Sequence, residues 1–324
     1  MSLKKKQSQV AAPTGVKKRN AFVKDLTQNY NLYLMMIPAT LIMVLFHYFS
    51  MYGITIAFKK YDMFSGIMGS PWVGFDNFIK FFNDPYCWRL IKNTILLGGQ
   101  NWFFGFFPPI ILAILMTELT SMKLKKAVQT ISYLPHFIPI VVVVGMMMTI
   151  LGPTGIVNRI LTENLGILDS PILFFNDPAL FRPMYIISGI WQGAGWGSIV
   201  YMAALSGVDQ QLYEAAFLDG ANRFQRIWHI SIPGILPTIT ILIILNVASI
   251  INVGYEKVYL MQNPATYDTS DVINTYVYRY GFKGVGGSNF SYTTAIGLFN
   301  SIVATLLMVI ANKTVDKLNG TALW

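Results

Sequence analysis

Polar and aromatic side chains recur at helical spacing inside two otherwise apolar segments of the chain. The later segment carries Asn246, Ser249, Asn252 and Glu256, and the earlier one carries Ser188, Trp191, Gln192, Trp196 and Tyr201. The later set spreads over about a third of a helix circumference. Side-chain hydrogen bonds to hydroxyls and aromatic stacking on C–H faces would together suit a glycan. The alternative is that such residues bond between neighbouring membrane helices, for about 0.6–2 kcal/mol each.

Residues that could support catalysis or bind a metal ion are sparse and scattered. The single cysteine, Cys87, allows neither an intramolecular disulfide nor a cysteine-based zinc site. The three histidines, His47, His136 and His229, lie far apart in the sequence. We therefore expect no metal site and no catalytic residues. The sequence also lacks the Gly-x-x-x-x-Gly-Lys-Ser/Thr loop that cradles nucleotide phosphates.

The composition is that of an integral membrane protein. Hydrophobic residues make up 54% of the 324 positions and charged residues only 12%, whereas soluble proteins carry about 25% charged residues. The formal net charge of +9 is not gathered into one basic face, so nucleic acid is not an expected partner.

Six segments are long and apolar enough to cross a bilayer as helices, which takes about 20 residues. Most contain Gly, Pro, Asn or Gln, as expected of helices that face other helices. We therefore predict an all-α integral membrane protein with six transmembrane helices. The predicted spans are residues 32–58, 93–117, 133–151, 183–206, 234–254 and 293–312.

The distribution of charge orients these spans. With the N-terminus in the cytoplasm, the cytoplasmic segments hold 14 cations and 6 acids, whereas the opposite side holds 10 cations and 9 acids. This positive-inside bias places both termini in the cytoplasm.

The same topology divides the chain into three parts. A basic cytoplasmic tail (1–31), which would be attracted to anionic lipid, precedes the membrane domain (32–312) and a cytoplasmic C-terminal tail (313–324). Three long loops, 59–92, 152–182 and 255–292, lie outside. Aromatic residues interleaved with Gly and Pro favour loops that rest at the lipid headgroups, although they could also receive a soluble partner.

A polar interlude, "YEAAFLDGANRFQRIWHISIP", separates the fourth and fifth spans and so lies in the cytoplasm. Asp209 is a plausible N-cap for a helix that starts at Gln210, and Gly220 supplies the freedom for a sharp turn. A second helix from Ala221 to about Ile230 would end before Pro233, because proline cannot continue a helix. The pattern predicts a two-helix bracket over about 210–232.

Each arm of the bracket is only about 15 Å long. It is too short to cross a bilayer and well sized to fill a groove on another protein. Periodicity alone leaves open a second interpretation, in which an amphipathic helix lies on the lipid headgroups.

The order of residues in this interlude resembles the EAA signature of ABC importer permeases. The signature is Glu-Ala-Ala, three residues, Gly, nine residues, Ile, one residue, Leu and Pro. The matching positions here are Glu214, Ala215, Ala216, Gly220, Ile230, Ile232 and Pro233. Ile232 departs from the usual leucine, which is a conservative apolar exchange.

The resemblance extends over nearly the whole chain after about residue 28. Segments such as "WRLIKNTILLG", "YLPHFIPIVVVVGM" and "YEKVYLMQNPATYDTSDVINTYVYRYG" are similar to the polysaccharide-type permeases of the LplB family. That family belongs to the carbohydrate-uptake group, which includes the maltose permeases.

This resemblance implies a type I ABC importer permease in the bacterial cell membrane, which crosses the membrane several times and is not itself an enzyme. Its bracket would be a coupling helix that docks into a cytoplasmic ATPase, with Glu214 reaching the ATPase and Gly220 making the turn. The residues expected to couple to the ATPase are Glu214, Ala215, Ala216, Asp219, Gly220, Arg223 and Pro233. We expect no cofactor on this chain, because ATP and Mg²⁺ would bind to the partner ATPase.

The resemblance also implies the partners. They are a second, homologous permease that forms a heterodimer with this chain, two cytoplasmic ATPase subunits, and an extracytoplasmic sugar-binding protein of lipoprotein type. An oligosaccharide would cross by alternating access, and membrane lipid would surround the complex.

Two rival functions predict patterns that the sequence lacks. An ion-coupled secondary sugar transporter would need an Asp, Glu or Arg near the middle of a span, and the six spans contain almost none. A polytopic membrane enzyme would need carboxylates or histidines clustered on one membrane face.

Overall fold

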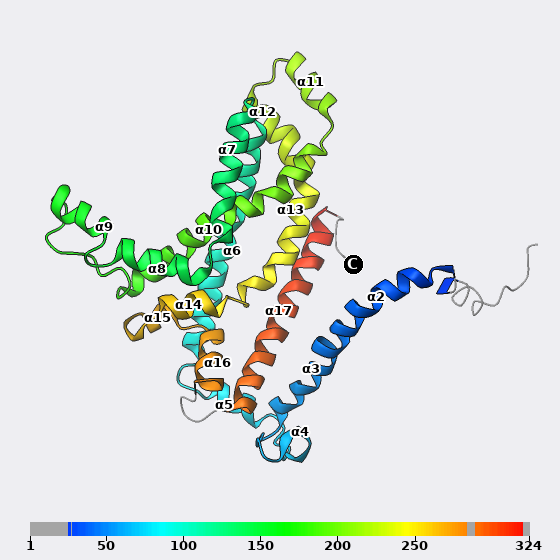
Figure 1. Ribbon diagram of the computed structural model, residues 1–324, viewed down its shortest axis with the longest axis vertical. Helices are drawn as coiled ribbons and strands as arrows, with labels where there is room; N and C mark the ends of the chain where they lie inside the picture. The colour runs from blue at the N-terminus through cyan, green and yellow to red at the C-terminus, as the bar shows by residue number, and fades with distance from the viewer. Residues whose placement is uncertain (1–24, 27, 284–288, 320–324) are drawn as a thin grey trace, which may run out of the picture. The chain divides into compact units, whose positions relative to one another are not determined.

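The computed structural model describes residues 25–26, 28–283 and 289–319 of the chain (Figure 1). Most of the basic N-terminal tail and the last five residues lie outside these ranges, so their expected roles stay predictions. The chain divides into two units, Met1–Thr55 and Ile56–Trp324.

In the first unit, one apolar helical stretch dominates. α2 (Tyr30–Met43) passes through a π-helical turn, Val44–Tyr48, into α3 (Phe49–Met51), and a 3₁₀ turn, Tyr52–Phe58, leads into the second unit. The whole stretch Tyr30–Phe58 is long and apolar enough to cross a membrane, which agrees with the first predicted span. Large apolar side chains along it are exposed, as suits contact with lipid or another helix.

Four long helices frame the second unit. They are α6 (Cys87–Thr117), α10 (Pro178–Ser206), α13 (Ile232–Val247) and α17 (Phe290–Asn319). α10 packs along α6, and α13 packs against both α10 and α17 (Figure 1). One buried apolar cluster joins α6, α10 and α13 through residues such as Ala113, Leu205 and Ile235.

Shorter helices complete this unit. They are α4 (Gly66–Gly69), α5 (Asp76–Phe82), α7 (Met122–Tyr133), α8 (Ile140–Leu151), α9 (Ile156–Arg159), α11 (Gln210–Leu218), α12 (Arg223–Arg226), α14 (Tyr255–Met261), α15 (Tyr267–Ser270) and α16 (Ile273–Gly281). In the described residues the only strand-like pairing is an isolated bridge between Lys59 and Trp72. The predicted all-α class is therefore confirmed.

The helices that are long and apolar enough to cross a membrane correspond to five of the six predicted spans. They are Tyr30–Phe58, Cys87–Thr117, Ile140–Asn164, Arg223–Ile250 and Phe290–Lys317. The fourth predicted span, residues 183–206, falls within α10, which is 29 residues long. Its Gly, Ser and Gln residues make α10 less apolar than the other five, and it is packed against α6 along its length.

The prediction of one continuous helix over residues 133–151 is wrong. α7 ends at Tyr133, a 3₁₀ turn covers Leu134–Phe137, and the chain is extended at Ile138 before α8 begins at Ile140. Pro135 and Pro139 lack the N–H group that an uninterrupted helix would need here. α8 itself is only 12 residues long and stops at Gly152, so the stretch Ile140–Asn164 also contains a break.

The fifth predicted span also ends earlier than expected. α13 stops at Val247, a 3₁₀ turn covers Ala248–Ile250, and α14 starts as a separate helix at Tyr255. Glu256 therefore does not share a helix with Asn246, and the predicted single polar face is broken after Ser249.

The end of α13 is held against α6 at a glycine. A Cβ atom on Gly98 would overlap the backbone carbonyl of Ile250, so any larger residue there would force the two segments apart. Small residues at such crossings let membrane helices approach closely. Gly98 therefore sets the distance between α6 and the turn that follows α13.

A network around buried Asp271 attaches the segment after α14 to the helices beside it. The Asp271 carboxylate accepts a hydrogen bond from Arg279 at 2.7 Å and lies 3.6 Å from the Arg89 guanidinium. Asn93, on α6, donates to the carbonyl oxygens of Asp268 and Asp271, and Arg182, on α10, donates to Asn93 at 2.9 Å. Because Arg89 and Asn93 lie on α6 and Arg182 lies on α10, the network fixes this segment relative to both helices.

The glycine crossing can be tested with a matched pair. Gly98→Ala should destabilise the protein by about 1–3 kcal/mol, the usual cost of overpacking a tight site. Gly99→Ala should be neutral or slightly stabilising, because a Cβ there meets nothing within 4 Å. Thermal denaturation of the purified protein measures both. Equal melting temperatures for the two variants would contradict the assigned crossing.

Candidate functional site

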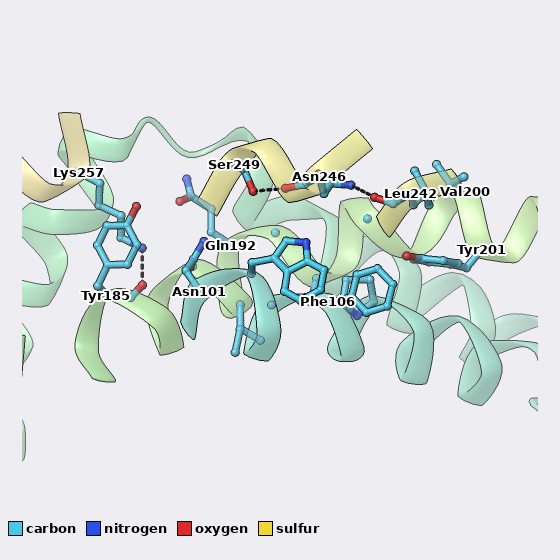
Figure 2. A pocket seen from close by; sticks show the side chains of 18 residues that line it. Asn101, Phe106, Tyr185, Gln192, Val200, Tyr201, Leu242, Asn246, Ser249 and Lys257 are labelled. Atoms are coloured by element: carbon cyan, nitrogen blue, oxygen red, sulfur yellow. Dashed lines mark hydrogen bonds between the residues drawn. The ribbon is translucent and has the colours of Figure 1, made fainter. Parts of the chain in front are cut away.

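A cavity of about 470 Å³ lies between α6, α10 and α13, and α14 closes one end (Figure 2). This volume is within the range of small-molecule binding pockets, about 300–1,000 Å³. The side chains that surround it come from all four helices and are mainly neutral. The polar and aromatic ones are Asn101, Trp102, Phe106, Tyr185, Gln192, Tyr201, Asn246, Ser249 and Lys257.

Three of the neutral polar side chains are each anchored on one side. Gln192 donates to the carbonyl oxygen of Ile138 at 2.9 Å, and Asn246 donates to that of Leu242 at 2.8 Å. Ser249 donates to the carbonyl oxygen of Asn246 at 2.5 Å. An amide has two N–H donors and an acceptor oxygen, and a hydroxyl oxygen can also accept. The anchored groups therefore keep hydrogen-bonding capacity for a ligand.

Aromatic rings cover another part of the cavity wall. Trp102 and Phe106 are stacked with their ring centroids 6.0 Å apart at an interplanar angle of 26°. The indole N–H of Trp102 is buried and has no hydrogen-bond partner within the described part of the chain. Buried polar groups normally have partners, so this N–H lacks the hydrogen bond that its burial would normally require.

Four of the nine predicted pathway residues line this cavity, and the other five do not. The four are Gln192, Tyr201, Asn246 and Ser249. Gln192 and Tyr201 lie on α10, Asn246 lies on α13, and Ser249 lies in the 3₁₀ turn that follows α13. Since no ligand is present, their role in binding stays a prediction.

The other five predicted residues have different surroundings. Ser188 donates to the carbonyl oxygen of Met184, on its own helix. Trp196 stacks on His136 with 4.7 Å between ring centroids, and Trp191 is 48% exposed away from the cavity lining. Asn252 accepts a hydrogen bond from Asn300 at 3.0 Å, and Glu256 is exposed in the first turn of α14.

Several cavity residues were missed at the sequence level. Asn101 lies inside the second predicted span, where a polar residue is a functional signal in itself, so it could have been found. Tyr185 and Lys257 carry no such signal. Lys257 reaches the cavity only because the chain leaves α13 and turns back into α14.

The described residues contain no group of three His, Cys, Asp or Glu side chains placed to hold a metal ion. The candidate functional features are the cavity and the two-helix bracket.

The predicted bracket is present at one end of the helices (Figure 1). Asp209 caps α11 by accepting a hydrogen bond from the backbone N–H of Gln211. Gly220 has φ of +79°, a conformation that favours glycine, and makes the turn to the second arm. Asn222 and Gln225 then form a reciprocal capping box at the start of α12. The second arm therefore begins at Arg223, not at Ala221 as predicted.

The prediction that Pro233 ends the second arm is also wrong. α12 continues through a π-helical stretch, Ile227–Ser231, directly into α13, and Pro233 lies in the first turn of α13. A π-helical turn changes the hydrogen-bond register, and such irregular turns are where a helix accommodates a proline. The second arm and the fifth span thus form one continuous helical element.

The bracket presents exposed side chains of both kinds. Apolar residues on it are strongly exposed, among them Leu218 at 85% and Phe224 at 83%. Of the predicted coupling residues, Glu214, Ala215 and Ala216 lie on α11, Asp219 and Gly220 form the turn, Arg223 begins α12, and Pro233 lies in α13. All except Ala216 are exposed. One hydrogen bond, between Tyr213 and Ser231 at 2.9 Å, ties the first arm to the second.

Two similar proteins of Bacillus subtilis align with nearly the whole chain. The chain is 41% identical over 294 residues to Protein LplB of Bacillus subtilis (strain 168), covering 90% of this chain and 91% of that protein. It is 40% identical over 302 residues to the polygalacturonan/rhamnogalacturonan transport system permease protein YteP of the same organism, covering 93% and 92%.

Solved structures give the same result. A bacterial ABC transporter involved in the import of the acidic polysaccharide alginate contains a chain that matches with a TM-score of 0.83 and 41% identity, covering 92% of this chain and 99% of that one. The alginate transporter in complex with an alginate pentasaccharide-bound periplasmic protein matches equally well, over 93% and 99%.

Residues 109–318 match the family model described as the binding-protein-dependent transport system inner membrane component. The match covers α10, the bracket, α13 and nearly all of α17, and so includes most of the cavity and the whole bracket. The resemblance to carbohydrate-uptake ABC importer permeases is thereby confirmed, and this chain belongs to the binding-protein-dependent transport system inner membrane component family, as a permease rather than an enzyme.

Proposed function

We propose that this chain forms part of the path by which an ATP-driven importer moves an oligosaccharide into the cell by alternating access. The bracket made by α11 and α12 carries this proposal. It is an exposed two-helix element that continues into α13, a helix that lines the cavity. A force that another protein applies to the bracket would be transmitted directly to the cavity wall.

In this proposal the bracket docks on a separate ATPase subunit, which binds ATP and Mg²⁺. Glu214 supplies a charge on the exposed face of α11, and apolar Leu218 and Phe224 supply area to bury against a groove. Exposed apolar residues gathered on one element are typical of a protein contact. Gly220 permits the turn between the two arms, because few other residues adopt its positive φ.

The cavity supports an oligosaccharide as cargo. Anchored amides, a hydroxyl and stacked aromatic rings are available together, and they are the groups that recognise sugar hydroxyls and C–H faces. Relatives with about 40% identity belong to transport systems for polygalacturonan and for alginate. We extend the carbohydrate class, and not those individual cargos, to this chain.

The complete importer would contain further subunits. A second, homologous permease would form a heterodimer with this chain, two ATPase subunits would bind on the cytoplasmic side, and an extracytoplasmic lipoprotein would deliver the sugar. The alginate transporter bound to its periplasmic protein provides the precedent for delivery by a binding protein. The positive-inside bias supports the placement of both termini and of the bracket in the cytoplasm.

Substitutions in the bracket should uncouple transport. Glu214→Ala should remove a charge from the docking face, and Gly220→Val should force a β-branched residue into a positive φ, at a cost of about 1–3 kcal/mol. We expect each to lower ATP-driven oligosaccharide uptake at least tenfold and to reduce co-purification of the ATPase. Uptake into proteoliposomes and quantitative pull-down measure these effects.

Lys313→Ala serves as the control, since it removes an exposed charge from α17 instead. It should leave both readouts at the wild-type level. Wild-type uptake and wild-type ATPase association in Glu214→Ala and Gly220→Val would contradict the proposed coupling.

Two serines give a matched test of the cavity. Ser249 lines it and Ser188 does not, yet each hydroxyl donates to a nearby backbone carbonyl. Ser249→Ala should lower oligosaccharide uptake about three- to tenfold, the equivalent of one hydrogen bond of about 1 kcal/mol. Ser188→Ala should have little effect. Equal losses in the two variants would show that the cavity assignment is wrong.

A further inference from the structure

One end of the cavity contains a buried lysine. Lys257, on α14, is only 8% exposed, and its ammonium group lies beside Tyr185 (Figure 2). The Lys257 Nζ donates to the backbone carbonyl of Tyr185 at 2.8 Å and lies 4.5 Å from the centre of its ring. At the other end of the cavity are Tyr201 and Val200, so the positive charge is at one extremity of an elongated space.

This charge has no carboxylate partner. Among the described residues no Asp or Glu oxygen lies within 4.0 Å of Nζ, and Lys257 is the only charged residue of the cavity lining. The adjacent Glu256 is exposed. Buried charges are normally paired, because leaving an ion unpaired away from water is costly. The backbone carbonyl of Tyr185 accepts one hydrogen bond from the ammonium, and the Tyr185 ring lies beside it. Because an ammonium has three N–H donors, donors remain for a ligand.

The charge persists at neutral pH. Lys257 lies on α14, which begins after the candidate membrane span that ends at Ile250, so Lys257 is outside that span. Burial lowers the pKa of the Lys257 ammonium to about 8. Because that value is above 7, the protonated form dominates under ordinary conditions.

A glycine, Gly189, lies beside the ammonium. A Cβ atom added to Gly189 would lie 3.4 Å from the Lys257 Nζ and 3.5 Å from the Asn101 Oδ1. The ammonium and the amide oxygen of Asn101 therefore both lie beside Gly189, and both side chains line the cavity. The ammonium suits an anionic group, and the amide oxygen can accept a hydrogen bond from a hydroxyl beside it.

We propose that the Lys257 ammonium binds the carboxylate of a uronic-acid unit, so that this chain selects acidic over neutral oligosaccharides. The proposal rests on the proposed function, since it names the class of sugar that the importer carries. A charge-assisted hydrogen bond to a carboxylate is short and about twice as strong as a neutral one. A single lysine matches one carboxylate at a time, and the neutral amides elsewhere in the cavity would bind the hydroxyls.

The test measures charge preference directly. The complete importer, in nanodiscs and without its sugar-binding protein, is titrated with trigalacturonate and with the same trisaccharide after its carboxyl groups are reduced to alcohols. The wild type should bind trigalacturonate at least tenfold more tightly, which corresponds to about 1.4 kcal/mol. Lys257→Met should reduce this preference to twofold or less and leave the affinity for the reduced trisaccharide unchanged.

Two further variants separate charge from structure. Lys257→Arg retains a positive charge and should keep most of the preference. Lys92→Met removes an exposed charge from α6 and should bind both probes as the wild type does.

Three outcomes would overturn the proposal. In the first, the wild type binds trigalacturonate no more tightly than the reduced trisaccharide. In the second, the Lys257→Met variant loses affinity for both probes equally. In the third, the wild type prefers a sulfated trigalactan over trigalacturonate. ATP-driven uptake by the complete importer distinguishes this failure from that of the proposed function. Uptake that is intact but indifferent to charge contradicts only the role of Lys257, whereas the absence of any oligosaccharide uptake contradicts the proposed function.

Discussion

The packing of α13 against α6 and α10 is the constraint on which the cavity depends. α6 and α10 lie along each other, and α13 is joined to both through the buried cluster that contains Ala113, Leu205 and Ile235. Near its end, contact with α6 at Gly98 brings the chain close enough for the turn after Ile250 to redirect it into α14. Without that approach Asn246 and Ser249 would not face Asn101, and Lys257 would not reach the cavity.

The same helix connects the two functional features. α12, the π-helical stretch Ile227–Ser231 and α13 form one uninterrupted helical element. One end of it is an arm of the exposed bracket, and the other end lines the cavity. In the proposed mechanism, movement of the bracket would therefore reach the cavity wall through a continuous helical element and not through a loop. The hydrogen bond between Tyr213 and Ser231 adds the first arm to that element.

The chain's local signals predicted its local structure well. The N-cap at Asp209 and the turn at Gly220 follow from the preferences of single residues, and both are present. The expectation for Pro233 is wrong because a proline usually ends a helix, whereas here it lies in the first turn of α13, directly after the π-helical stretch Ile227–Ser231. The break before α8 could have been found, since two prolines lie within five residues there.

Only four of the nine predicted pathway residues line the cavity, and the reason differs from that for the helix boundaries. Gln192 and Asn246 were found because polar residues stand out inside apolar spans. Which of the polar residues face the same space depends on helix rotation and on where α13 ends, and both are set by contacts between distant segments. Trp196 shows this clearly: it has the right type and spacing, but its ring is stacked on His136 outside the cavity lining.

The proposed alternating access requires the cavity to open to one side of the membrane in one state and to the other side in the next. The single native cysteine, Cys87, is buried, so Ser249→Cys would place one accessible thiol in the cavity. Labelling with a membrane-impermeant thiol reagent from each side measures access directly. It is carried out with and without ATP held unhydrolysed on the ATPase subunits. We expect the introduced thiol to react from the cytoplasmic side in the resting importer and from the outer side when ATP is trapped. Reaction from the same side in both states would contradict alternating access through this cavity.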